Sequence, residues 1–83
     1  MKYTVVWTPT AERDLAQIWL LATDRKAISA ASNRIDALLS RDAGSRGYPV
    51  FDTVRELIMP PLGVNFDVSE DDRLVYVLAV WPV

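Results

Sequence analysis

The sequence alternates between apolar and small or polar residues over eight positions, from Leu62 to Ser69. Every second residue is a large apolar one: Leu62, Val64, Phe66 and Val68. This period of two predicts an antiparallel strand with one buried face and one more polar face. Pro60 and Pro61 stand before it and predict a turn, because proline cannot donate to a strand ladder. A strand of this kind needs neighbours in a sheet and a second layer that covers its apolar face.

Two predicted helices in the first half of the chain supply that layer. Thr8 can cap a helix and Pro9 is tolerated at its first position, so a helix is expected from there to about Thr23. Asp24 is the expected cap of a second helix, which Gly44 ends by adopting a left-handed conformation. Apolar residues recur at helical spacing in both segments: Ala11, Leu15, Ile18, Trp19 and Ala22 in the first, and Ile28, Ala31, Ile35, Leu38 and Leu39 in the second.

The remaining segments complete a sheet. Residues 3–8 and 51–59 are expected to be strands, and residues 45–49 a loop. Residues 74–81 are apolar on both faces, which predicts an interior strand with the first strand beside it. We therefore expect one domain over residues 1–83 with the order β-α-α-β-β-β. Its class is α+β, in two layers, with a helix hairpin packed on a mostly antiparallel four-stranded sheet.

Composition excludes several functions. The 83 residues contain no Cys and no His, so the chain has no disulfide, no thiolate nucleophile and no imidazole base or zinc ligand. The pI of about 4.8 is unlike that of a typical nucleic-acid binder. Residues 48–83 hold two basic and six acidic residues. No signal peptide or membrane span is expected, and the absence of Cys fits the cytoplasm.

Four segments together resemble the RelE/ParE family of toxins from type II toxin–antitoxin modules. They are residues 6–15 (VWTPTAERDL), residues 54–57 (VREL), residues 61–68 (PLGVNFDV) and residues 74–81 (LVYVLAVW). The resemblance covers nearly the whole chain and implies a RelE-like fold. It also implies a cytoplasmic protein that inhibits growth, that a cognate antitoxin neutralises, and that acts without metal or cofactor.

RelE-like members of this family cleave messenger RNA on the ribosome. If this chain is such an enzyme, a metal-independent endoribonuclease, the resemblance points to Arg55, Arg46 and Tyr76 as catalytic residues. Such cleavage needs proton transfer and positive charge on the phosphate. An ordinary Tyr has a pKa of about 10 and is a poor base at neutral pH. Gly63 and Ala79 stand where the family often has basic residues.

ParE-like members poison DNA gyrase and need a binding surface in place of a catalytic set. The deficit of basic residues favours this activity over an efficient ribonuclease. A third reading is a degenerate member that binds its antitoxin without being toxic.

Partner binding is expected at Trp19, Arg34, Arg41 and Trp81, because Trp favours interfaces and the predicted hairpin is the basic half of the chain. The antitoxin is the expected occupant of the helix hairpin groove and of the sheet near Arg55. The other candidate partners are gyrase and the ribosome with its messenger RNA. A homodimer and a hetero-oligomer with antitoxin both stay open.

Overall fold

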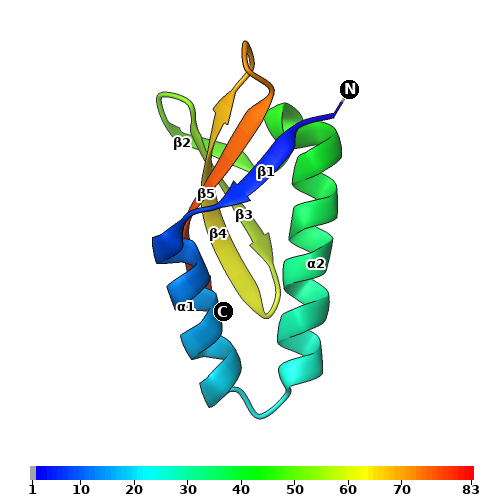
Figure 1. Ribbon diagram of the computed structural model, residues 1–83, viewed down its shortest axis with the longest axis vertical. Helices are drawn as coiled ribbons and strands as arrows, with labels where there is room; N and C mark the ends of the chain where they lie inside the picture. Colours follow the sequence, from blue (N-terminus) through cyan, green and yellow to red (C-terminus); the bar gives the residue numbers. More distant parts are fainter. Residues whose placement is uncertain (1) are drawn as a thin grey trace.

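The computed structural model describes residues 2–83 as one sheet with two helices packed along it (Figure 1). In chain order the elements are β1 (Thr4–Trp7), α1 (Pro9–Leu21), α2 (Arg25–Asp42), a 3₁₀ turn η1 (Ala43–Ser45), β2 (Tyr48–Phe51), β3 (Val54–Met59), β4 (Leu62–Ser69) and β5 (Leu74–Pro82). Neither helix is long and apolar enough to cross a membrane, within the part of the chain that is described.

The five strands lie in the order β1-β5-β4-β3-β2. Strand β1 runs parallel to β5, with Thr4 opposite Leu74 and Trp7 opposite Val77. All other neighbours are antiparallel. The predicted α+β class, the interior position of the last strand and the first strand beside it are confirmed.

Both predicted helix caps are present. The Thr8 side chain accepts a hydrogen bond from the Ala11 amide at 3.2 Å, and Asp24 accepts one from the Ala27 amide at 3.1 Å. The second helix ends at Asp42, two residues before Gly44, so its predicted end is close, but the left-handed conformation predicted for Gly44 was wrong. Gly44 lies in η1, and the left-handed glycine is Gly47, with φ of 64°. A Cβ on Gly47 would overlap the Glu56 carbonyl oxygen, so this position needs glycine.

The sheet has five strands where four were predicted. Residues 48–51 form β2, although residues 45–49 were predicted to be a loop and a strand was predicted to start at Phe51. The single predicted strand over residues 51–59 is divided by a turn at Asp52, which has φ of 47°. Asp tolerates the left-handed region better than most residues, so an apolar run can turn back on itself there.

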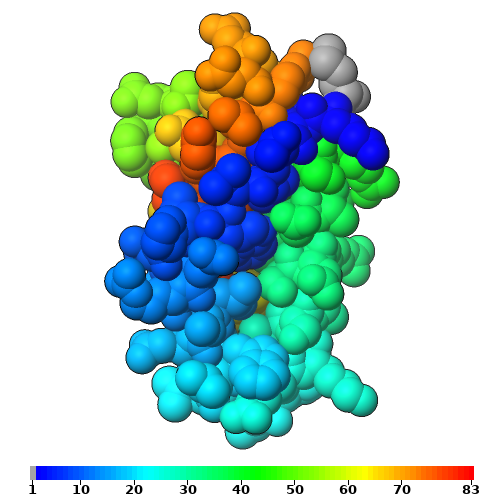
Figure 2. Space-filling view, in the orientation of Figure 1, coloured from blue at the N-terminus to red at the C-terminus, as the bar shows by residue number. Residues whose placement is uncertain are grey.

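One face of the sheet packs on the helices and the other does not. We call them the helix side and the open face. The helix side carries the core, whose largest fully buried side chains are Phe66, Ile35, Leu39, Leu62, Val64, Val75 and Val77. Figure 2 shows how closely the side chains of α1, α2 and β1 cover the molecule in this view. Every second residue of each strand points instead to the open face.

Candidate functional site

Arg55 lies on the helix side of β3, because it pairs with the buried Phe66 of β4. Its guanidinium is engaged by the backbone: Nε donates to the Arg46 carbonyl at 2.8 Å and Nη2 donates to the Gly47 carbonyl at 3.2 Å. These bonds hold the segment between η1 and β2 against β3. Arg55 therefore acts as a clamp on the chain in this structure.

Arg46 belongs to the segment that Arg55 holds. Its Nε lies 3.5 Å from the Asp42 carboxylate, with which it forms an ion pair across one turn. The structure thus brings Arg46 and Arg55 together, through the Arg46 backbone. Of the two guanidinium groups, one is bound to carbonyls and the other faces a carboxylate, so neither is presented alone to a phosphate.

Tyr76, the third residue predicted for catalysis, lies on the open face. It pairs across the sheet with Asp67 of β4, and Arg55 is on the opposite side. The nearest charged group in the register is therefore a carboxylate. The three predicted catalytic residues do not meet at one surface.

The open face also holds a tyrosine and a glutamate outside the predicted catalytic set of Arg46, Arg55 and Tyr76. Tyr48 of β2 donates its hydroxyl hydrogen to Glu56 of β3 at 2.6 Å. This hydrogen bond, desolvation and the negative charge of Glu56, in that order, raise the pKa of Tyr48 above its ordinary 10.0. Tyr48 is therefore a hydrogen-bond donor at neutral pH and cannot serve as a base.

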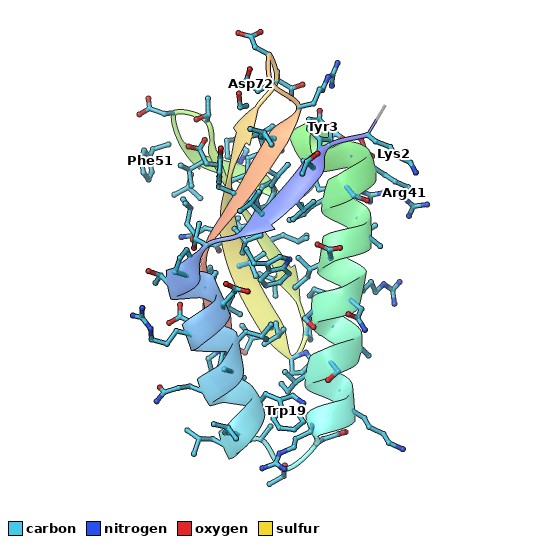
Figure 3. All side chains as sticks on the ribbon, viewed as in Figure 1. Lys2, Tyr3, Trp19, Arg41, Phe51 and Asp72 are labelled. Atoms are coloured by element: carbon cyan, nitrogen blue, oxygen red, sulfur yellow. The ribbon has the colours of Figure 1, made fainter. Side chains whose placement is uncertain are left out.

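Trp19 lies between the lower ends of the two helices (Figure 3). Its indole nitrogen donates to the Ser29 hydroxyl at 3.2 Å, and the Arg25 guanidinium stacks on the ring at 4.5 Å from its centre. It lines a groove, here called the hairpin groove, formed by Glu12, Leu15, Ala16, Trp19 and Leu20 of α1 and Ile28, Ser29 and Ser32 of α2.

The end of α1 is more apolar on its surface than the sequence pattern predicted. Trp19, Leu20 and Leu21 are 38%, 61% and 83% exposed in succession. Three adjacent large apolar residues exposed at a protein surface are typical of an interaction site. Sequence reasoning missed Leu20 and Leu21, although their position off the apolar stripe of the helix was the available signal.

Arg34 and Arg41 lie on α2, seven residues apart and therefore on the same face of the helix. Both are exposed, and neither forms an ion pair with another residue of the described range 2–83. They present positive charge outward from the helix layer and away from the open face.

Trp81 is on the open face, where it pairs with Gly63. A Cβ added to Gly63 would lie 2.5 Å from the indole nitrogen of Trp81. The indole therefore rests directly on the glycine, and this contact explains why a residue without a side chain occupies position 63. The four residues predicted for partner binding are spread over the hairpin groove, the outer face of α2 and the open face.

Solved structures share this fold over the whole chain. A chain of the toxin–antitoxin complex RelBE2 from Mycobacterium tuberculosis superimposes with a TM-score of 0.82, at 21% identity and 100% coverage of both chains. A chain of the chromosomal ParDE TA system from P. aeruginosa gives 0.72 at 24% identity, covering 99% of this chain and 97% of its own length. A mutant of the E. coli toxin RelE in the free state gives 0.67 at 12% identity, covering 99% and 84%.

No protein-family model matches the sequence. No curated protein sequence matches it either. At 12–24% identity the likeness to the solved structures establishes the fold. The RelE-like fold implied by the sequence resemblance is confirmed.

Proposed function

We propose that this chain is the toxin component of a type II toxin–antitoxin module and that it is neutralised by an antitoxin. The observation that carries the proposal is the superposition on the RelBE2 chain, which leaves no part of either chain unmatched. That structure is of a toxin–antitoxin complex, and the ParDE structure is of a toxin–antitoxin system. The four sequence segments that resemble the RelE/ParE family support the same proposal independently of the coordinates.

We place the antitoxin contact at the hairpin groove and the adjoining end of α1. The groove is about 440 Å³ in volume and mostly apolar, and the exposed Leu20 stands at its margin. An amphipathic helix would bury its apolar face against such a surface. Trp19 is the expected anchor, because Trp combines a large apolar area with one hydrogen-bond donor.

Between the two activities of the family we favour a ParE-like, gyrase-directed one. The guanidinium of Arg55 is engaged by backbone carbonyls, and Tyr76 faces Asp67. Cleavage of RNA requires cationic groups beside the phosphate, where negative charge develops in the transition state. Beside Tyr76 the chain instead presents the carboxylate of Asp67. Inhibition of a protein target makes no such demand.

The first experiment is induced expression of the chain with and without the product of the adjacent reading frame. Growth arrest that the neighbour relieves, together with a stable complex of the two proteins, is the expected result. Normal growth on induction and no complex would contradict the toxin proposal. The same strains separate the activities: loss of negative supercoiling in plasmid DNA indicates gyrase inhibition, and cleaved transcripts indicate a RelE-like endoribonuclease acting through Arg46, Arg55 and Tyr76.

A substitution in the hairpin groove tests the docking surface. Leu20→Glu is expected to leave growth arrest intact and to abolish relief by the antitoxin, because it places a charge in the apolar contact. Thr10→Glu adds the same charge near the start of the same helix and is the matched control. Relief that persists in Leu20→Glu would show that the contact lies elsewhere, and loss of relief in both variants would show that the effect is not specific to the groove. A chain that binds the antitoxin but never arrests growth is the degenerate member.

A further inference from the structure

The open face of the sheet is a second apolar surface, separate from the hairpin groove. Tyr48, Ile58 and Tyr76 on this face are 53%, 39% and 38% exposed, and the Trp81 indole lies over Gly63 beside them. These side chains come from three strands of one continuous sheet. The helices pack on the other side, so no element of the described chain covers this surface.

The charged side chains on this surface are all acidic. Glu56 and Asp67 occupy neighbouring strands, two residues apart in register, which puts their Cα atoms roughly 8 Å apart. Each accepts one hydrogen bond within the chain, Glu56 from Tyr48 and Asp67 from Thr53. In each carboxylate the second oxygen makes no hydrogen bond to the described residues 2–83, so both face solvent with acceptor capacity left.

Positive charge is missing from the open face. Within residues 2–83, Arg55 is the one basic residue that lies in a strand, and it points to the helix side. The turns at one end of the sheet hold further charged residues: Asp52 follows Phe51, and Asp72 lies in the β4–β5 turn beside Arg73, which pairs with Glu70. Figure 3 shows Phe51 and Asp72 at the same end of the molecule.

These observations select the chemistry of an occupant. A nucleic acid would bring phosphates against Glu56 and Asp67, which costs free energy. A second copy of the chain related by a two-fold axis would bring carboxylates against carboxylates. A polypeptide with apolar and basic residues would match both the aromatic surface and its charge, since cations also bind favourably over Tyr and Trp rings.

We propose that the open face binds a cationic, amphipathic polypeptide segment. Its apolar side chains lie on Ile58, Tyr76 and Trp81, and its Arg or Lys side chains pair with Glu56 and Asp67. The binding surface is distinct from the hairpin groove, and the inference holds whether or not the chain arrests growth, because it concerns binding by the purified protein.

The three tryptophans provide the test. In amide-correlation NMR, titrate the ¹⁵N-labelled chain with a twelve-residue peptide of alternating Arg and Leu, and with an otherwise equal peptide in which Glu replaces Arg. The indole signal of Trp81 reports the open face. The indole signals of Trp7 and Trp19 report the helix layer, because their N–H groups donate hydrogen bonds to Asp36 and Ser29 of α2. The basic peptide is expected to shift the Trp81 signal and to leave the other two unchanged.

Isosteric variants separate specific pairing from general attraction to an acidic protein. Glu56→Gln with Asp67→Asn keeps both acceptors for Tyr48 and Thr53 but removes the charges, and is expected to weaken the basic peptide about tenfold. Asp24→Asn with Asp36→Asn removes the same charge from the helix layer, keeps the acceptors for the Ala27 amide and the Trp7 indole, and is expected to change affinity less than twofold. Three outcomes would overturn the proposal: equal weakening by both pairs, shifts confined to Trp7 and Trp19, or equal binding of the acidic peptide.

Discussion

Replacing Arg55 with Ala should destabilise the chain strongly, because it removes the clamp on the segment between η1 and β2. The bond from Nε to the Arg46 carbonyl is partly buried, and hydrogen bonds from charged donors contribute about 1.5 to 3 kcal/mol. The bond to the Gly47 carbonyl is exposed, so water replaces most of it and it adds about 0.5 kcal/mol. The expected loss is about 2 to 3 kcal/mol in the free energy of unfolding.

Thermal unfolding followed by circular dichroism measures this loss. In a domain of this size, 2 to 3 kcal/mol lowers the Tm by about 10 to 20 °C. Arg55→Lys should recover about half of it, because an ammonium group keeps the charge but cannot reach two carbonyls as a planar fork does. Arg34→Ala is the control: that exposed guanidinium makes no bond in residues 2–83, and its loss should stay within about 0.5 kcal/mol.

An unchanged Tm in Arg55→Ala would refute the clamp. If growth arrest were lost at the same time, Arg55 would have to act on a target, as the ribonuclease reading requires. A lowered Tm with growth arrest retained at low temperature would instead fit a structural role alone.

Three further predictions follow from contacts described above. Gly63→Ala should destabilise the chain by about 1 to 3 kcal/mol in denaturant unfolding, because the new Cβ displaces the Trp81 indole, and the loss should shrink when Trp81 is already Ala. In ultraviolet titration, the difference between the wild type and Tyr48→Phe gives the titration of Tyr48, whose midpoint should lie above pH 10 and should fall in Glu56→Gln. Because the pKa of Tyr48 is higher in the folded than in the unfolded chain, the hydrogen bond to Glu56 stabilises the fold below pH 10. This stabilisation is lost as the pH rises through the pKa of the folded chain. Arg25→Ala should cost about 1 to 2 kcal/mol and shift the Trp19 indole signal, because Arg25 donates to the Trp19 and Leu20 carbonyls at the end of α1 and stacks on the Trp19 ring. An unmoved Trp19 signal in that variant would contradict the stacked geometry.

Local chemistry made much of the fold predictable. Thr8 and Asp24 are caps by residue type, and the period of two at residues 62–69 placed β4 correctly. β2 was missed because its four residues include a proline and are all exposed, so neither propensity nor burial marked it. The boundary between β2 and β3 is the turn at Asp52. This turn requires a positive φ at Asp52, which an Asp residue can adopt but which the sequence does not require.

The site was less predictable, because its contacts join distant parts of the chain. Arg55 was expected to be catalytic if the chain is a ribonuclease, and its partners are carbonyls whose positions depend on the path of a loop. Residues 74–81 are apolar on both faces, which correctly predicted an interior strand. The pattern did not show that helices cover only one of these faces, and the apolar side chains on the other face form the proposed peptide surface.

The parallel pairing of β1 with β5 also constrains the order of events during synthesis. Val5 lies beside Val75, so the first strand finds its partner only after synthesis has passed Val75. The apolar faces of α1 and α2 also stay exposed until β4 and β5 have been synthesised, because the buried side chains they pack against belong to those strands. Contacts this remote in sequence slow folding and expose apolar surface in the meantime. The nascent chain therefore passes through an interval in which a partner or a chaperone can bind it before the sheet closes.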